Sequence, residues 1–182
     1  MERVYIFDTT LRDGGQTKGV DFSFADKIAI SEALDDLGID YIEGGWPGAN
    51  PTDDKLFGSP PKLKVSNFVA FGMTRRPNTS AANDPGLNAV LSGKSDSVCL
   101  VGKTWDFHVS KALNITLEEN IDMISESINE INKRGKQALF DCEHFFDGFK
   151  NNKKFALECC LLYTSDAADD MQCVDLGGRR II

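Results

Sequence analysis

The chain has 182 residues, of which 41% are hydrophobic and 26% are charged, a composition typical of globular proteins that excludes a disordered or fibrous chain. Its formal net charge of -8 argues against non-specific binding to nucleic acid or to anionic membranes, because both require clustered Lys and Arg. The sequence shows neither a transmembrane-length apolar stretch nor a secretory signal, so we expect a cytoplasmic protein.

Apolar, β-rich segments alternate with helical patterns along the chain. Strands are predicted at 4–7, 41–43, 65–71, 97–101 and 138–142, and helices at 24–37, 84–91 and 117–134. Strands that alternate with helices indicate an α/β protein with a parallel sheet. The five cysteines are odd in number and lack zinc-type spacing, so we expect reduced thiols that mostly fill the core.

Capping signals mark the ends of two of these helices. Ser23 precedes the first helix and Gly38 follows it, while Thr116 and Glu119 form a capping box before the third, which Gly135 closes. The apolar residues expected to face the sheet are Ile28, Ile30, Ala33, Leu34 and Leu37 in the first helix, and Ile121, Ile124, Ile128 and Ile131 in the third.

Polar side chains lie at or just after the predicted strand ends. They are Asp8, Arg12, Asp13, Glu43, Lys103 and Glu143. In a (β/α)8 barrel this end of the strands carries the active site. A closed barrel has eight strands and typically about 250 residues, so the sequence predicts an incomplete TIM barrel of about the first five strands.

The segment 7–16, Phe-Asp-Thr-Thr-Leu-Arg-Asp-Gly-Gly-Gln, is the most informative. A hard divalent cation prefers carboxylate oxygens, and a neighbouring guanidinium can neutralise an enolate or hold a substrate carboxylate. Asp13 and Arg12 are therefore candidates for a metal ligand and its catalytic neighbour. From spacing alone, a structural ion pair of Arg12 with Asp8 or Asp13 is an equal alternative.

This decapeptide resembles the signature of the metal-dependent TIM-barrel acyltransferases, a family that includes isopropylmalate, homocitrate and citramalate synthases. Segments 41–51, 71–74, 80–86, 99–109 and 140–148 resemble the citramalate synthase branch in particular. The position of Gly15 is usually Glu or Ala in relatives, which puts the rigidity of this loop in question. The resemblance extends over residues 3–158.

The resemblance implies a Claisen condensation of acetyl-CoA with pyruvate to citramalate and CoA, in branched-chain amino-acid biosynthesis. It implies Asp13 as ligand of a divalent Mg, Mn or Zn ion, Arg12 as catalytic and substrate-binding residue, Glu143 as catalytic residue, and Asp13 and Glu43 in the substrate pocket. The family's His-x-His ligands have no counterpart before residue 160, so the chain alone is expected to be inactive. The parent enzyme is expected to be a homodimer.

Several polar and aromatic residues remain open to more than one interpretation. His108 and His144 follow different strands and form no His-x-His pair, so a polar loop role is favoured over metal ligation. Trp105 and Phe107 are interpreted as packing at the barrel mouth. Lys103 is equally consistent with orienting an anion and with a solvated side chain.

The final segment differs in character from the rest. Residues 160–169 and 173–182 resemble reading-frame translations of the two parts of a sequencing-library adapter, so residues 160–182 are interpreted as a non-native tail and residues 1–159 as the N-terminal part of the catalytic domain. Two alternatives to the condensation remain. One is an isopropylmalate-type synthase or metal-dependent 2-oxo-acid aldolase, and the other is a non-catalytic fragment.

Overall fold

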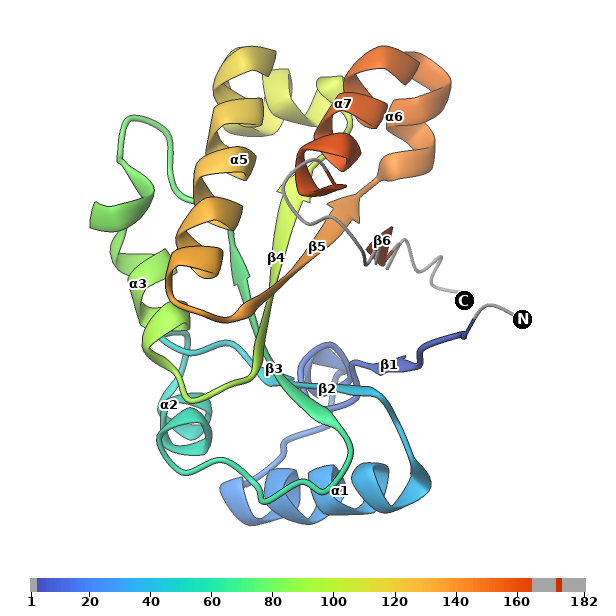
Figure 1. The fold of residues 1–182 in the computed structure, drawn as a ribbon, viewed down its shortest axis with the longest axis vertical. Coiled ribbons are helices and arrows are strands. Elements are labelled where there is room, and N and C mark those ends of the chain that lie inside the picture. Colours follow the sequence, from blue (N-terminus) through green and yellow to red (C-terminus); the bar gives the residue numbers. More distant parts are fainter. Residues whose placement is uncertain (1–2, 165–172, 175–182) are drawn as a thin grey trace. The chain divides into compact units, whose positions relative to one another are not determined.

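The structure is a computed structural model that describes residues 3–164 and 173–174 (Figure 1). Strands alternate with helices along the chain, as the sequence predicts. The elements are β1 (Phe7–Asp8), α1 (Phe24–Leu37), β2 (Tyr41–Gly45), α2 (Pro51–Gly58), β3 (Asn67–Met73), α3 (Pro85–Ser92), β4 (Ser97–Lys103), α4 (Asp106–His108), α5 (Leu117–Lys133), β5 (Gln137–Glu143), α6 (Phe145–Asn151), α7 (Lys153–Thr164) and β6 (Cys173–Val174). Shorter turns are 3-10 helices at Gly14–Gln16 and Ala81–Asn83 and a π-helix at Val109–Leu113.

The first strand differs from its prediction. β1 has two residues, whereas Val4 and Ile6 lie outside it with 84% and 54% of their surface exposed. The Asp40 carboxylate accepts a hydrogen bond from the Ile6 N–H at 2.9 Å and pairs with Arg3 at 2.5 Å. The Ile6 carbonyl accepts the N–H groups of Asp40 and Tyr41 at 3.2 and 3.1 Å, so both a side chain and the backbone hold the approach to β1.

Helix α2 was not predicted, although its start has two local signals. The Asn50 side chain caps the helix by accepting the Asp53 N–H at 2.9 Å, and Pro51 occupies the first turn. The helix has only eight residues, too few to show a clear apolar period.

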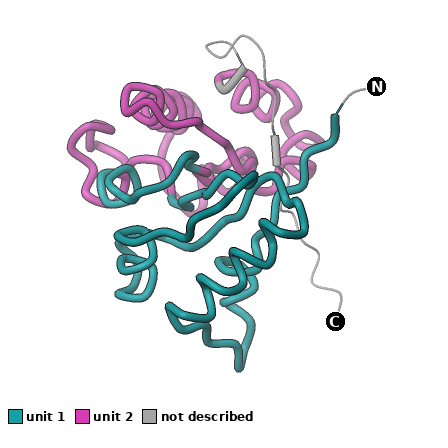
Figure 2. Tube along the Cα trace, turned by 60° about the horizontal axis from the view of Figure 1, so that its bottom comes forward, with its two compact units in different colours: residues 1–72, 88–98 teal, residues 73–87, 99–182 magenta. Residues whose placement is uncertain are grey.

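The chain forms two compact units, coloured teal and magenta in Figure 2. Unit 1 comprises residues 1–72 and 88–98, and unit 2 comprises residues 73–87 and 99–182. In unit 1, β1, β2 and β3 are neighbours in that order and run parallel, with Phe7 opposite Tyr41 and Tyr41 opposite Asn67. Helix α1 packs against β2 and α2, and Leu11 and Ile42 are almost fully buried in the core.

Helix α1 has the predicted bounds, but its predicted buried face is partly wrong. The full capping box forms between Ser23 and Asp26, and Gly38 ends the helix in the left-handed conformation. The buried residues, however, are Lys27, Ser31 and Asp35, whereas Ala33 and Leu37 are exposed. A polar stripe at spacing i, i+4, i+8 can face inward because each of its members has a hydrogen-bond partner there.

Asp35 anchors the segment before β3 to α1. Burial raises the pKa of its carboxyl, but the N–H groups of Val65, Lys64 and Ser66, which it accepts at 2.8–3.0 Å, hold the pKa well below its usual range. A carboxyl with a depressed folded pKa stabilises the fold above its unfolded pKa near 4 and loses this contribution as the pH falls below that value.

We therefore expect Asp35→Asn to lower stability at pH 7 and to flatten the loss of stability between pH 5 and pH 2. Urea unfolding midpoints measured across this range check the prediction. The exposed Asp36, which pairs only with Lys64 among the interactions resolved, provides the control substitution Asp36→Asn. Parallel pH curves for Asp35→Asn and the wild-type chain would contradict this account.

Unit 2 contains β4, β5 and β6, which are neighbours in that order, and β5 and β6 run parallel. Helix α5 packs against β5 and α7, and Ile124, Ile128 and Ile131 are buried as predicted, while Ile121 is half-buried. Thr116 caps α5 by accepting the Glu119 N–H at 3.1 Å. The Glu119 carboxylate pairs with Arg75 at 2.9 Å, so this capping box is only half formed.

The cysteines lie largely in the core, as predicted. Cys99, Cys142 and Cys159 are buried, and Cys160 is half-buried. Burial, with contributions from Cys160 and Glu158, raises the pKa of Cys159 to about 12, so this thiol is unreactive near neutral pH.

The predicted tail is only partly described. Residues 160–164 continue α7 and residues 173–174 form β6, whereas 165–172 and 175–182 lie outside the described residues. The interpretation of 160–182 as a non-native tail stays a prediction.

Candidate active site

The turn after β1 holds the signature residues in a fixed arrangement. The N–H groups of Arg12, Asp13 and Gly14 all donate to the Thr9 carbonyl, at 2.8–3.2 Å. The Asp8 carboxylate accepts the N–H and the hydroxyl of Thr10, both at 3.0 Å. Asp8 therefore stabilises the turn, and Arg12 and Asp13 are the charged residues that the turn presents.

Arg12 is held on two sides within unit 1. Its Nε donates to the Glu43 Oε2 at 2.6 Å, and its guanidinium carbon lies 3.9 Å from the centre of the Phe71 ring. The Arg12 side chain is 10% exposed and that of Glu43 is fully buried. A buried, charge-assisted pair combined with stacking on an aromatic face fixes the plane of the guanidinium. The structure thus brings together two of the predicted site residues, from β2 and from the turn after β1.

Asp13 differs from its neighbours in being open to solvent. Its side chain is 62% exposed, and its carboxylate lies 3.3 Å from Arg12 Nη1. An exposed carboxylate beside a turn is a suitable single oxygen ligand for a hard divalent cation. Among the residues that the structure describes, no group of three or more His, Cys, Asp or Glu side chains is placed to hold a metal ion. Asp13 could therefore contribute one ligand to a site whose other ligands come from elsewhere.

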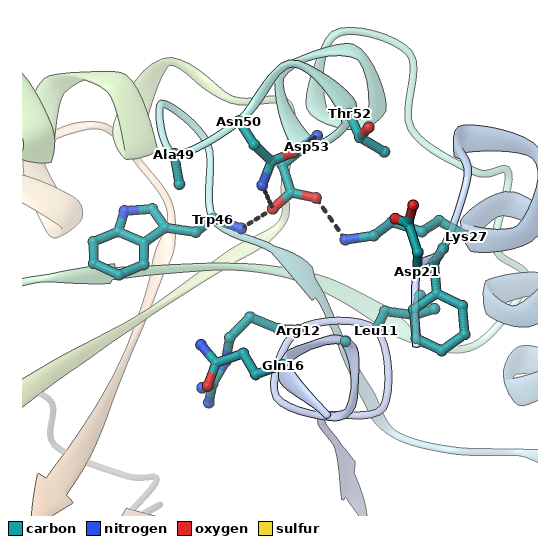
Figure 3. Close-up of a pocket in the computed structure, with 12 residues that line it drawn as sticks. Leu11, Arg12, Gln16, Asp21, Lys27, Trp46, Ala49, Asn50, Thr52 and Asp53 are labelled. Atoms are coloured by element: carbon teal, nitrogen blue, oxygen red, sulfur yellow. Dashed lines mark hydrogen bonds and ion pairs between the residues drawn. The ribbon is translucent and has the colours of Figure 1, made fainter. Parts of the chain in front are cut away.

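A pocket of about 240 Å³ lies beside Arg12 in unit 1 (Figure 3). Gln16, Trp46 and a buried pair, Lys27 and Asp53, also line it. Sequence reasoning did not single out Lys27 or Asp53. The available signal was a lysine one helical turn before Ser31 on the buried face of α1, which requires a buried anionic partner.

Glu143 occupies the end of β5 in unit 2, where it forms an ion pair with Lys103 at the end of β4. The Glu143 carboxylate is 33% exposed, and its backbone carbonyl accepts the Thr104 hydroxyl at 2.8 Å. The sequence left the role of Lys103 open between orienting an anion and solvation. The structure shows that Lys103 is paired with a carboxylate of the protein itself.

The two histidines lie together in unit 2. The rings of His108 and His144 are in edge-to-face contact with centroids 4.5 Å apart, and Trp105 packs against both. Burial, the charge of His144 and that of Lys103 lower the pKa of His108, so it is neutral near pH 7. His144 Nδ1 lies 3.4 Å from the Asp147 carboxylate. Trp105 is thus a packing residue, as predicted, while Phe107 is 49% exposed.

Comparison with known proteins identifies the relatives of this chain. The family model described as HMGL-like matches residues 3–163. The chain belongs to the HMGL-like family. It is 46% identical over 179 residues to an (R)-citramalate synthase of Aquifex aeolicus and 41% identical over 177 residues to one of Sulfolobus acidocaldarius. These alignments cover 97% and 96% of the chain but 34% of each relative, so the chain spans about a third of the length of these curated relatives.

Solved structures of this family share the fold. The chain resembles an HMG-CoA lyase of Brucella melitensis with a TM-score of 0.60 and 20% identity, covering 80% of this chain and 50% of that one. It resembles a hydroxymethylglutaryl-CoA lyase of Pseudomonas aeruginosa with a TM-score of 0.62 and 16% identity, covering 80% and 49%. The prediction of an incomplete TIM barrel with about five strands is confirmed.

In residues 3–164 and 173–174, no helix combines the length and the apolar character that crossing a lipid bilayer requires.

Proposed function

We propose that the protein to which this chain belongs condenses acetyl-CoA with pyruvate and water to give citramalate and CoA. The similarity of 41–46% to several (R)-citramalate synthases over nearly the whole chain supports this activity most strongly. The match to 2-isopropylmalate synthases is lower, at 28–29%, which favours pyruvate over a larger 2-oxo acid. A cytoplasmic location and a homodimeric state are part of the same proposal.

Arg12 would bind the 2-oxo acid and stabilise the enolate of acetyl-CoA. A guanidinium has five N–H donors, and its resolved hydrogen bonds to Glu43 and Asp13 use two of them. The remaining donors can meet a carboxylate or an enolate oxygen in a bidentate arrangement. Glu43 would act by holding the guanidinium, since its carboxylate is fully buried and does not line the pocket beside Arg12.

Asp13 would provide one ligand of a divalent Mg, Mn or Zn ion, since its carboxylate is exposed next to Arg12. Such an ion would supply Lewis-acid polarisation of the keto oxygen. The His-x-His ligands implied by the resemblance would come from residues beyond this chain, so a tight metal site is not expected from the chain alone. Glu143 would lie near the oxo acid or the acetyl group, with Lys103 holding its carboxylate.

The alternative of a non-catalytic fragment applies only to the isolated chain. With one candidate metal ligand and about a third of the length of its relatives, the 182-residue chain is expected to release no CoA by itself. That result would be compatible with the proposed activity of the longer protein. A test of the proposal therefore needs the remainder of the barrel.

A chimera supplies that remainder. Residues 1–159 of this chain are joined to the part of the Aquifex aeolicus (R)-citramalate synthase that follows the matching position. We expect pyruvate-dependent release of CoA thiol from acetyl-CoA, abolished by chelation of divalent ions, and weaker release with 2-oxoisovalerate. A folded chimera that releases CoA no faster with pyruvate than without it would overturn the proposal. Equal or greater release with 2-oxoisovalerate would instead favour the isopropylmalate-type alternative.

A further inference from the structure

The pocket beside Arg12 is also lined by a second buried ion pair, formed by Lys27 of α1 and Asp53 of α2. Lys27 Nζ lies 2.5 Å from Asp53 Oδ1, and the two side chains are 8% and 7% exposed. A pair that only joined two helices could lie anywhere along them. This pair instead faces the pocket beside Arg12, where Figure 3 shows its hydrogen bonds converging on the Asp53 carboxylate.

Both members of the pair also bind the backbone that follows Glu43. Lys27 Nζ donates to the Gly44 carbonyl at 2.9 Å, and Asp53 Oδ2 accepts the Trp46 N–H at 2.9 Å. Asn50 Nδ2 adds another donor to the same carboxylate oxygen at 2.9 Å. The buried pair therefore fixes both ends of segment 44–46, which comprises the last two residues of β2 and Trp46.

Two paths lead from segment 44–46 to Arg12. Along the chain, fixing Gly44 fixes the adjacent Glu43, whose carboxylate receives the Arg12 Nε–H at 2.6 Å. Through packing, the ring of Trp46 contacts the ring of Phe71 edge-to-face with centroids 5.4 Å apart, and Phe71 lies under the guanidinium. The hydrogen-bond partner and the stacking partner of Arg12 thus both depend on the position of segment 44–46.

We propose that Lys27 and Asp53 are positioning residues that hold the Arg12 guanidinium in its orientation through segment 44–46. They touch neither substrate nor metal in this proposal. The functional importance of the orientation rests on the proposed role of Arg12 in the condensation. The positioning itself is a property of unit 1 and can be measured without turnover.

The measurement is hydrogen exchange of the Arg12 Nε–H, followed by NMR in the 182-residue chain with ¹⁵N-labelled arginine. The Arg12 signal is assigned by its disappearance in Arg12→Lys. Asp53→Asn replaces the carboxylate that pairs with Lys27 by a neutral amide. We therefore expect exchange of the Arg12 Nε–H to accelerate by at least about tenfold. The Nε of Arg75 in unit 2, which lies 2.7 Å from Oε2 of Glu126 in an ion pair, provides an internal reference whose exchange should not change.

Asp35→Asn is the matched control in unit 1. It removes a buried carboxylate from the same helix as Lys27. The partners of the Asp35 carboxylate are the N–H groups of residues 64–66, away from segment 44–46. We expect less than about a twofold change in Arg12 exchange for this variant. If Asp53→Asn does not fold, Asn50→Ala, which removes one donor to Asp53 and the cap of α2 but keeps the ion pair, should give a smaller acceleration that is still specific to Arg12.

Unchanged Arg12 exchange in a folded Asp53→Asn or Asn50→Ala variant would overturn the proposal. So would equal acceleration in Asp35→Asn, because the effect would then report general loosening of unit 1. Failure of this experiment would leave the proposed condensation intact, since the chimera assay measures turnover independently. Failure of the chimera assay would likewise leave the measured positioning unaffected.

Discussion

Replacing Arg12 with Lys in the chimera is expected to lower kcat/KM for pyruvate by about 100-fold to 1000-fold, the range seen when a donor to developing charge is removed. A lysine ammonium keeps the charge but offers a point rather than a planar fork. It cannot at once donate through an Nε–H to Glu43, stack flat on Phe71 and grip a carboxylate with two donors. Steady-state CoA release at several pyruvate concentrations measures the loss.

The control is Arg76→Lys, since Arg76 is exposed and lies outside the site. It should behave as the unmodified chimera. If Arg12→Lys retained more than a tenth of the activity, the planar guanidinium would not be the group that binds the substrate or the enolate.

The substitution Gly45→Ala is expected to lower the free energy of unfolding by about 1–3 kcal/mol through overpacking, in addition to about 1 kcal/mol for the lost backbone preference of glycine. A Cβ at this position would lie 2.5–2.6 Å from the Cγ, Oδ1 and Oδ2 atoms of Asp53. The carboxylate cannot retreat without giving up Lys27 and the Trp46 N–H, to both of which it is bonded. The φ of +155° at Gly45 is also one that residues with a side chain rarely adopt. Urea denaturation of the 182-residue chain measures the effect.

Gly38→Ala provides the comparison, because Gly38 also has a positive φ, +86°, but no atom lies within 4 Å of its Cβ position. It should lose only the backbone preference of glycine, about 1 kcal/mol. Equal losses of unfolding free energy for Gly38→Ala and Gly45→Ala would show that contact with Asp53 does not constrain segment 44–46.

Local signals predicted α1, α3 and α5, whereas α2, α4, α6 and α7 were not predicted. Helix α1 begins and ends where Ser23 and Gly38 place it, because a capping box and a left-handed glycine act over three or four residues and are readable in the sequence. The short helix α2 was missed, since the Asn50 and Pro51 signals had no clear apolar period after them. Similarly, β1 was placed too early, because only Phe7 and Asp8 lie in register with β2, and the residue before them is held by hydrogen bonds with Asp40 and Tyr41.

The candidate site divides in the same way. The motif resemblance identified Arg12, Asp13, Glu43 and Glu143, and the structure places Arg12, Asp13 and Glu43 together in unit 1 and Glu143 in unit 2. Their partners depend on contacts between distant segments. Arg12 meets Glu43 across 31 residues, and Lys27 meets Asp53 across 26. No local pattern encodes such separations, so the buried pair beside the site became visible only in the structure.

The most direct test of the proposed function follows the carbon that should form the new bond. The chimera is incubated with pyruvate and acetyl-CoA labelled with ¹³C at the acetyl methyl, and the product is analysed by NMR. The proposed condensation predicts that the label appears in a methylene group bonded to the quaternary, hydroxyl-bearing carbon of citramalate. Label recovered only in acetate while CoA is released would mean thioester hydrolysis without carbon–carbon bond formation, and would contradict the account.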